Sequence, residues 1–251
     1  MIGIYFSGTG NTKHCVETFV KQYDSSGVCV SIENRHAPAQ IALQDTVVLG
    51  YPVYYSNIPK IMQDFIHRNK AVFRNKQVLI ITTMGLWSGD GAGCAARRLR
   101  RQGATIIGGL HLKMPDCIGD EKVLIKTEAA KRALFAQADA KIALAVHKTK
   151  EGTPPRDGLS FHCRVAGLLG QRLWFSHKTA AYQQKPVVSR QKCVGCGLCV
   201  TLCPMQNMTL EGETAISHDR CTLCYRCFGH CPTQALTILG KRVYEQFLFE
   251  K

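Results

Sequence analysis

The sequence predicts an α/β domain with a doubly wound, five-stranded parallel sheet, followed by a small α+β domain that is rich in cysteine. Two observations support this. Short β-branched runs alternate with helical segments over the first 150 residues, and one cysteine pattern occurs twice in the last quarter. A chain of 251 residues has room for one or two domains. We expect domains at residues 1–150 and 184–241, joined by a linker and connector helix (151–183) and followed by a C-terminal tail (242–251).

The predicted strands are short apolar runs at Ile2–Phe6, Val28–Ile32, Thr46–Gly50, Gln77–Thr83 and Thr105–Leu112. Apolar residues recur at helical spacing between and after them, which predicts helices at Thr12–Tyr23, Ile58–Asn69, Gly91–Gln102 and Glu128–His147. Strands that alternate with helices of this length form a parallel sheet, because each crossover needs a helix. We therefore expect helices on both faces of the sheet.

A linker is predicted at Glu151–Gly158, which contains two glycines and two prolines among charged residues. The segment that follows it, Phe161–Tyr182, mixes apolar and basic residues, and we interpret it as a connector helix. A poorly ordered basic spacer is the alternative.

The cysteine pattern is the most specific signal in the chain. It occurs as Cys193-x-x-Cys196-x-x-Cys199-x-x-x-Cys203-Pro204 and again, 28 residues later, as Cys221-x-x-Cys224-x-x-Cys227-x-x-x-Cys231-Pro232. In such paired runs the fourth cysteine ligates the cluster of the other run. The spacing predicts two [4Fe–4S] clusters, one bound by Cys193, Cys196, Cys199 and Cys231 and the other by Cys203, Cys221, Cys224 and Cys227.

Zinc and disulfides are the alternatives for these cysteines. A structural zinc site usually takes two pairs of ligands, whereas each run here has four cysteines. A disulfide framework needs export, and the first residues have no basic segment of the kind that begins a signal peptide. No apolar run approaches the roughly 18 residues that span a bilayer. We therefore expect a cytoplasmic protein with reduced thiols and no membrane span.

A candidate phosphate loop, Ser7–Thr12, lies between the first predicted strand and the first helix. Its hydroxyl groups and the N–H groups of a helix N-terminus favour a bound phosphate. The loop lacks the lysine of an ATP-type loop, and Lys13 stands at the third glycine position of the dinucleotide fingerprint. A plain glycine-rich turn is the alternative.

These six residues match the flavodoxin phosphate loop, [ST]-x-T-G-x-T, at every position. The segments Gly50–Tyr55 and Thr83–Asp90 resemble the two flavodoxin loops that enclose the isoalloxazine ring of FMN. Together with the cysteine runs, the chain up to about residue 240 resembles the EFR1-type flavodoxin–ferredoxin fusion family. The resemblance implies a flavodoxin-like sheet that binds FMN, followed by a ferredoxin-like domain with two clusters.

The resemblance and the loop positions give a set of candidate FMN contacts. At the phosphate they are Ser7, Thr9, Gly10, Asn11 and Thr12, and around the ring they are Pro52, Val53, Tyr54, Met84, Gly85, Trp87 and Gly89. Loops beyond the carboxyl ends of parallel strands converge on one edge of the sheet, where such ligands bind. Tyr54 and Trp87 offer flat faces for stacking, but Tyr51 and Tyr55 are alternatives to Tyr54. Core packing is the alternative for each aromatic.

The formal net charge is +14, and two clusters and a flavin phosphate would reduce it to roughly +8. A basic electron carrier favours an acidic redox partner or an anionic surface. One candidate docking patch is formed by Arg97, Arg98, Arg100 and Arg101, with a solvated helix face as the alternative. No nucleic-acid-binding motif accompanies the charge.

These features predict an electron-transfer protein that passes electrons between its two clusters and FMN and on to a redox partner. A flavin-dependent reductase of a small organic substrate, fed by the clusters, is the alternative, and a redox sensor is a third. We predict no catalytic residue, because no acid or base stands out beside the ring loops. No chemistry is assigned to the remaining cysteines, which are Cys15, Cys29, Cys94, Cys117 and Cys163.

Overall fold

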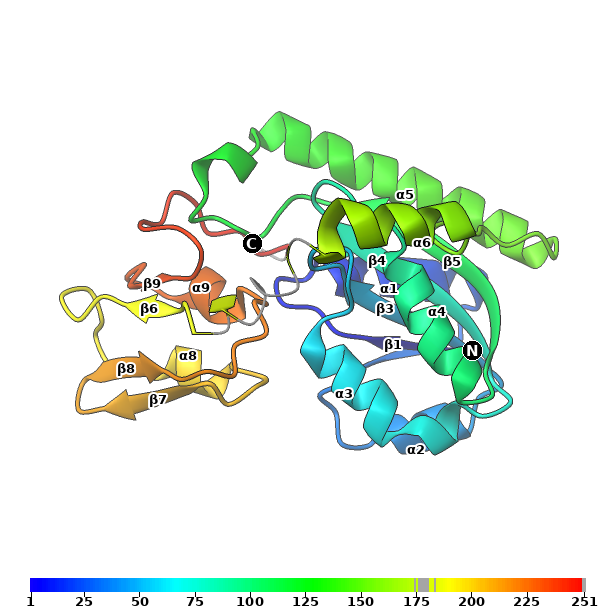
Figure 1. Ribbon diagram of the computed structural model, residues 1–251, viewed down its shortest axis with the longest axis horizontal. Coiled ribbons are helices and arrows are strands. Elements are labelled where there is room, and N and C mark those ends of the chain that lie inside the picture. The colour runs from blue at the N-terminus through cyan, green and yellow to red at the C-terminus, as the bar shows by residue number, and fades with distance from the viewer. Residues whose placement is uncertain (174, 176–180, 183, 250–251) are drawn as a thin grey trace. The chain divides into compact units, whose positions relative to one another are not determined.

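The computed structural model describes residues 1–173, 175, 181–182 and 184–249, and its chain divides into two compact units (Figure 1). Unit 1 comprises Met1–Ser7, Asn11–Pro115 and Glu128–Trp174. Unit 2 comprises Gly8–Gly10, Asp116–Thr127 and Phe175–Lys251.

Unit 1 contains a five-stranded parallel sheet in the order β2-β1-β3-β4-β5. The strands are β1 (Ile2–Tyr5), β2 (Val28–Ser31), β3 (Thr46–Pro52), β4 (Gln77–Met84) and β5 (Thr105–Lys113). The central strands β3 and β4 are buried on both faces, as expected for a parallel sheet covered by helices. The predicted doubly wound sheet is therefore confirmed.

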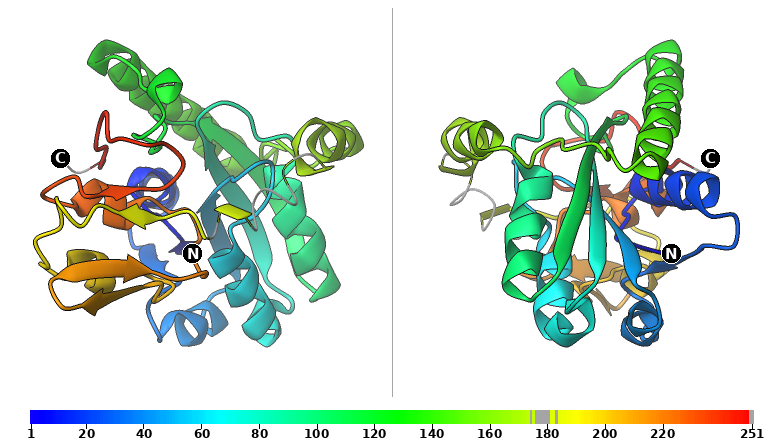
Figure 2. Two further views of the ribbon diagram at one scale, coloured as in Figure 1. Left: turned by 60° about the vertical axis from the view of Figure 1, so that its left-hand side comes forward. Right: turned by 90° about the vertical axis from the view of Figure 1, so that its right-hand side faces the viewer.

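Helices cover both faces of this sheet, with α1 and α5 on one side and α4 on the other (Figure 2). They are α1 (Asn11–Tyr23), α2 (Ala37–Ala42), α3 (Lys60–Arg68), α4 (Gly91–Arg101) and α5 (Glu128–Lys150), with a short 3-10 turn at η1 (Lys70–Phe73). A second 3-10 turn, η2 (Lys122–Leu124), belongs to unit 2. The sequence did not predict α2, because only Ala37 and Ile41 of its six residues are buried and no apolar period is visible.

Two glycines of the sheet allow α1 to pack close to it. A Cβ atom on Gly3 would lie 2.7 Å from Cγ1 of Val16, and one on Gly50 would overlap the same valine. This close packing places the N-terminus of α1 directly beyond the carboxyl end of β1.

The predicted linker lies along the edge of the sheet. The N–H of Gly109 on β5 donates to the carbonyl of Pro155 at 2.8 Å, and the N–H of Asp157 donates back to Gly109 at 2.8 Å. These bonds cover an edge strand whose backbone groups would otherwise be open to other chains.

The connector begins as predicted at α6 (Phe161–Gly167), where the Ser160 hydroxyl accepts a hydrogen bond from the N–H of Cys163. It does not continue as a regular α-helix, because a π-helical turn, η3 (Leu168–Arg172), follows. Positions 174, 176–180 and 183 of the predicted helix and linker lie outside the described residues.

Unit 2 contains two small antiparallel sheets, β6 with β9 and β7 with β8. Its elements are β6 (Val187–Val188), α8 (Leu198–Thr201), β7 (Met208–Glu211), β8 (Thr214–Ser217), α9 (Arg226–His230) and β9 (Leu236–Thr237). The sequence offset of 28 residues relates α8 to α9 and β7 to β9. The unit is thus built from two similar halves, as the repeated cysteine pattern predicts.

Candidate functional site

Two cavities in unit 2 are each lined by four cysteines. One is lined by Cys193, Cys196, Cys199 and Cys231, and the other by Cys203, Cys221, Cys224 and Cys227. These are the two ligand sets predicted from the spacing, including the exchange of the fourth cysteine between the runs. The fold therefore brings together residues that are up to 38 positions apart in the sequence.

Left-handed backbone makes the tight turns that hold three cysteines of each run. In the first run Gly195 and Gly197 have φ of 65° and 72°, and in the second Leu223 and Tyr225 have φ of 56° and 58°. Glycine adopts this conformation without steric cost, whereas a side chain costs about 1–2 kcal/mol. The second half therefore carries strain that the first half avoids.

Backbone N–H groups donate to cysteine sulfurs around both cavities. Asn207 donates to Cys203 at 3.2 Å, Leu223 to Cys221 at 3.3 Å, Ala215 to Cys193 at 3.4 Å and Ala235 to Cys231 at 3.3 Å. Such donors stabilise negative charge on sulfur and help to set the reduction potential of a bound cluster.

The thiols of each set lie within one another's electrostatic field. Burial and the neighbouring Cys224 and Cys203 raise the pKa of Cys221 to about 12. Burial, followed by Cys193 and Cys196, raises the pKa of Cys199. Thiolates so close together need a positive counter-charge, and iron supplies it while displacing the protons.

Each cavity offers four cysteine sulfurs, which is the ligand number of a [4Fe–4S] cluster. Among the described residues, no three His, Cys, Asp or Glu side chains converge on a single metal position. A zinc ion needs its sulfur ligands at about 2.3 Å from one point, whereas a cubane cluster holds its ligands around a cage. The residues present therefore fit a [4Fe–4S] cluster in each cavity.

The two cavities differ in exposure. In the first cavity Cys196 is exposed, and the exposed apolar side chains of Val194 and Leu198 also line this cavity. Cys224 and Tyr225 at the second are buried. The first cavity thus lies closer to solvent than the second.

The second cavity is supported by a segment that the sequence did not connect with it, Asp116–Thr127. The hydroxyl of Tyr225 donates to Oδ1 of Asp120 at 2.9 Å. Oδ2 of the same buried carboxylate accepts the N–H groups of Ile238 at 2.6 Å and Leu239 at 2.9 Å. The segment lies far from the cysteine runs in the sequence and carries no motif, so the sequence gave no signal for such a role.

Gly8–Gly10 also belong to unit 2. The backbone of Gly8 lies against the carbonyl of Cys224, where a Cβ atom could not fit. The carbonyl of Thr9 accepts the N–H of Phe249 at 2.8 Å, and a Cβ atom on Gly10 would lie 2.6 Å from Cβ of Phe249. The glycines of this loop are therefore required by close packing.

In unit 1, the start of α1 and the ends of β4 and β5 come together. The Thr12 hydroxyl lies 2.7 Å from that of Thr83, and Nδ2 of Asn11 donates to the carbonyl of Pro115 at 2.8 Å. Oδ1 of Asn11 is buried and has no hydrogen-bond partner among the described residues. The first-turn N–H groups of α1 have no acceptor within the helix, and such donors are the groups that bind a phosphate like that of FMN.

The loops after β3 and β4 are packed against each other. The N–H of Val53 donates to the carbonyl of Thr83 at 2.8 Å, and Oγ of Ser56 lies 3.0 Å from the Cβ position of Gly89. Tyr54 and Asn57 close a tight turn through two backbone hydrogen bonds, with Tyr55 and Ser56 at positive φ. Strain of this kind is often kept at ligand-binding loops.

The aromatic candidates for the ring contact differ in burial. Tyr51 is fully buried and its hydroxyl donates to the carbonyl of Gly91 at 2.7 Å, so it is a core residue. Tyr54 and Tyr55 are partly buried, and Trp87 is 43% exposed. Of the remaining ring candidates, Pro52, Val53, Gly85 and Gly89 are partly buried and Met84 is buried.

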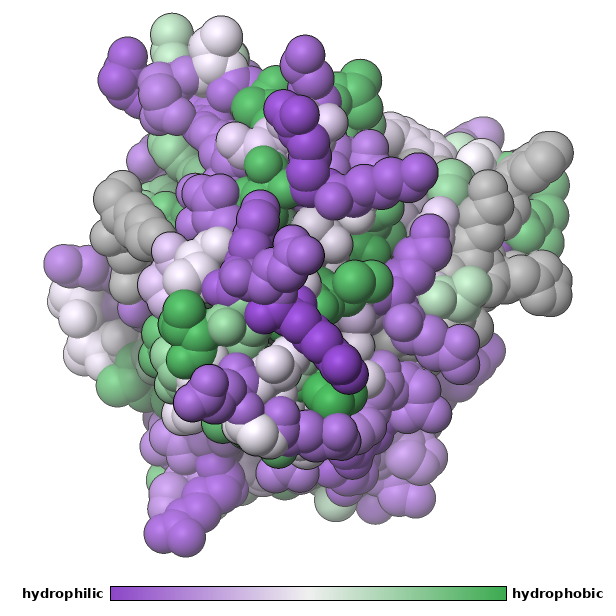
Figure 3. Space-filling model, turned by 90° about the vertical axis from the view of Figure 1, so that its left-hand side faces the viewer, coloured by the Kyte–Doolittle hydropathy of each residue, from purple (hydrophilic) through white to green (hydrophobic). Residues whose placement is uncertain are grey.

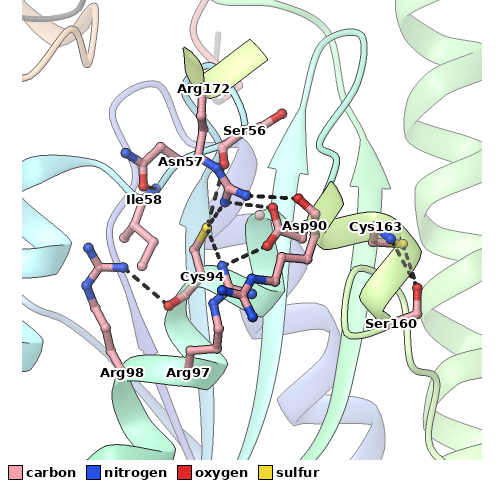
Figure 4. A network of polar contacts seen from close by, with 12 residues as sticks. Ser56, Asn57, Ile58, Asp90, Cys94, Arg97, Arg98, Ser160, Cys163 and Arg172 are labelled. Atoms are coloured by element: carbon pink, nitrogen blue, oxygen red, sulfur yellow. Dashed lines mark hydrogen bonds and ion pairs between the residues drawn. The ribbon is translucent and has the colours of Figure 1, made fainter. Parts of the chain in front are cut away.

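A charged network that the sequence did not reveal lies at the end of the β4 loop (Figure 4). The fully buried carboxylate of Asp90 forms ion pairs of 2.7 Å with Arg97 and with Arg172. The guanidinium of Arg172 also contacts Sγ of Cys94 at 2.6 Å. Burial and Asp90 raise the pKa of Cys94, while the arginines oppose the shift. The network ties the connector to the candidate ring loop.

Two of the four arginines of α4 form contacts within unit 1, and the other two face solvent. Arg97 pairs with Asp90, and Arg98 donates to Oε1 of Gln63 at 3.1 Å and to the carbonyl of Cys94. Arg100 and Arg101 are exposed. The predicted docking patch therefore retains two outward-facing arginines.

A cavity of about 480 Å³ lies on unit 1 beside Trp87. His111, Lys141 and Asp157 form its polar wall, where Nζ of Lys141 contacts Oδ2 of Asp157 at 2.6 Å. Burial, opposed by Asp157, lowers the pKa of His111 to about 4. These residues lie on separate elements, and their sequence positions did not suggest a cluster.

Comparison with known families gives the class of each part of the chain. Residues 2–103 match the model of a flavodoxin domain, and residues 178–235 match that of a 4Fe-4S dicluster domain. The chain is thus a fusion of these two domains. The dicluster domain implies two clusters, and the combination indicates a role in electron transfer.

Several solved flavodoxins resemble the chain. The two-electron reduced flavodoxin of Megasphaera elsdenii is 22% identical over 56% of this chain and 99% of its own, with a TM-score of 0.41. The Fusobacterium nucleatum flavodoxin bound to flavin mononucleotide is 13% identical over 61% and 98%, with a TM-score of 0.43. Flavodoxin 2 of Bacillus cereus is 21% identical over 56% and 97%, with a TM-score of 0.38. No curated protein matched the chain.

Within the described part of the chain, no helix is both long and apolar enough to cross a membrane.

Proposed function

We propose that this protein transfers electrons between two [4Fe–4S] clusters and an FMN and onward to a redox partner. The observation that carries this proposal is the pair of cavities, each lined by four cysteines in the crossed arrangement of a two-cluster ferredoxin. The proposed ligands are Cys193, Cys196, Cys199 and Cys231 for one cluster and Cys203, Cys221, Cys224 and Cys227 for the other.

FMN, when bound, exchanges one or two electrons, and each cluster exchanges one. We assign its phosphate to the loop of Ser7, Thr9, Gly10, Asn11 and Thr12, and its ring to the loops that follow β3 and β4. The hydroxyls and N–H groups of the first loop would hold the phosphate, and the packed ring loops would orient the flavin and limit its access to water. Joining both domains in one chain raises their effective concentration for each other.

Cofactor content tests this proposal. Protein purified without oxygen should contain about eight iron, about eight acid-labile sulfide and about one FMN per chain. Iron near two per chain, or protein without flavin after reconstitution with FMN, would contradict it.

The phosphate loop has its own test. Replacing Thr9 and Thr12 with glutamate should release FMN by charge repulsion while leaving iron and sulfide content unchanged. Replacing Thr105, which is exposed on unit 1 and lies outside both cysteine runs, with glutamate is the matched control and should leave all three contents unchanged. Flavin retained by the double variant would show that the loop is wrongly assigned.

A second candidate function is reduction of a small organic substrate, favoured by the cavity of about 480 Å³ beside Trp87. A cavity of this size can hold a small molecule, which a carrier for protein partners does not need. Replacing Gln137, which lines this cavity, with tryptophan should then slow oxidation of the reduced protein by that substrate. It should leave electron exchange with a protein acceptor unchanged.

A further inference from the structure

The connector of unit 1 presents an apolar stripe to solvent. The stripe consists of five large apolar side chains, each between 38% and 71% exposed: Phe161, Val165, Leu168, Leu169 and Leu173. Steps of four, three, one and four residues place them on one face of α6 and the π-helical turn η3. Soluble proteins rarely expose so many large apolar side chains together without a use for them.

The opposite side of the connector is held against unit 1. Arg172 pairs with the buried Asp90 at 2.7 Å, and the Cβ position of Gly167 also lies against that carboxylate. The Cβ position of Gly170 lies 3.1 Å from the ring of Trp87. Gly167 and Arg172 are five residues apart in the sequence, which is the interval of the hydrogen bonds in a π-helix. The π-helical turn therefore brings both residues to the side that faces Asp90. The stripe is therefore fixed outward, on the side of the sheet that carries α4 (Figure 2).

The connector itself carries charge of one sign. From residue 158 to residue 173 it contains Arg164 and Arg172 and no aspartate or glutamate. Arg164 and His162 flank the stripe and are exposed. An apolar face flanked by basic residues is typical of helices that lie in the surface of an anionic membrane.

We propose that this stripe, Phe161–Leu173, docks the protein on an anionic lipid surface. Its leucines and phenylalanine would enter the boundary between headgroups and acyl chains, and the basic flank would lie among the lipid phosphates. A second copy of the chain is a poorer occupant, because each copy carries a formal charge of +14 and would repel the other. This inference goes beyond electron transfer and does not depend on FMN.

Vesicle flotation of the purified holoprotein tests the proposal. We expect binding to vesicles of phosphatidylcholine mixed with phosphatidylglycerol, and little binding to phosphatidylcholine alone. The double variant Leu169→Asn, Leu173→Asn should bind about tenfold more weakly, because two apolar anchors are lost. Arg164→Gln should weaken binding less and reduce its dependence on salt.

A matched control uses two other exposed leucines of unit 1, in the variant Leu43→Asn, Leu144→Asn, which should bind as the unchanged protein does. The visible spectra of all variants should agree, which shows that the clusters are retained. Absence of binding to the mixed vesicles, or equal loss in both double variants, would overturn the proposal. Two other results would also overturn it. One is a dimer of the unchanged protein, detected by light scattering, that only the stripe variant abolishes. The other is a stripe variant that loses electron exchange with an acidic ferredoxin while the unchanged protein does not bind vesicles.

Discussion

Asp90 is the residue on which the candidate ring loop and the connector both depend. Its carboxylate is fully buried between Arg97 and Arg172, and the contacts are close ion pairs rather than aligned hydrogen bonds. A buried pair of this kind adds little by itself, but removal of one partner leaves an uncompensated charge.

Replacing Arg172 with methionine should lower the free energy of unfolding of unit 1 by about 3 kcal/mol, the lower end for a broken buried pair because Arg97 remains. Urea unfolding followed by far-UV circular dichroism measures this. The matched control is Arg101→Met, since Arg101 is exposed on the same unit and should matter little. Equal stability of both variants would contradict the role given to Asp90.

Protonation of His111 should make the stability of unit 1 depend on pH. Burial lowers its pKa to about 4, so the unfolded chain takes up a proton at higher pH than the folded chain does. Stability should therefore fall as the pH is lowered from about 6.5 to about 4, by about 3 kcal/mol for a shift of this size. Asp157, Lys141 and Asp90 act on the same imidazole, and Asp157 opposes the shift.

The measurement compares unfolding of the unchanged protein and of His111→Gln across that pH range. The variant should lack this component of the pH dependence. Identical profiles would mean that the imidazole titrates normally.

At the scale of elements, the five strands of unit 1 and four of the five helices from α1 to α5 follow from the sequence within a few residues. Their apolar periods are long and each strand is bounded by a turn, which is the condition under which such patterns are informative. The helix α2 was missed because it buries only two side chains. The cysteine sets were predicted because cluster geometry demands fixed spacing.

Other features depend on tertiary contacts that no local pattern encodes. Arg172 and Asp90 are far apart in the sequence, and the π-helical turn is understandable only once Gly167 and Arg172 are seen to share a partner. Likewise, Asp120 lies before α5 in the sequence and yet belongs to the cysteine-rich unit. The sequence could not show which of Tyr51 and Tyr54 is a core residue and which is a candidate ring contact, because the alternation of residues along a strand does not tell how deeply each is buried.

The segment Asp116–Thr127 should be necessary for unit 2. Replacing Asp120 with alanine leaves the Tyr225 hydroxyl and two backbone N–H groups without their acceptor, a cost of about 3 kcal/mol or more in a buried site. We expect loss of cluster absorbance at lower temperature, with flavin binding retained. Asp120→Asn keeps one acceptor oxygen and should be intermediate. An unchanged melting curve for the alanine variant would show that the segment is dispensable.

On the scale of the whole molecule, the net charge affects how partners associate, because electrostatic forces act over a longer range than contacts do. Hydrophilic side chains cover most of the face seen in Figure 3, with small separate apolar patches among them. The formal charge of +14 predicts association with acidic partners that weakens as salt is added. Reduction rates with an acidic donor at several ionic strengths would measure this, and rates independent of salt would contradict it.

The proposed function is electron transfer by two kinds of cofactor in one chain. Its most direct test is an anaerobic reductive titration of the purified protein, followed by its visible spectrum. We expect about four electron equivalents per chain, one for each cluster and two for FMN, and about two for the variant with glutamate at Thr9 and Thr12. Uptake of about two equivalents by the unchanged protein, with no flavin signal, would contradict the account.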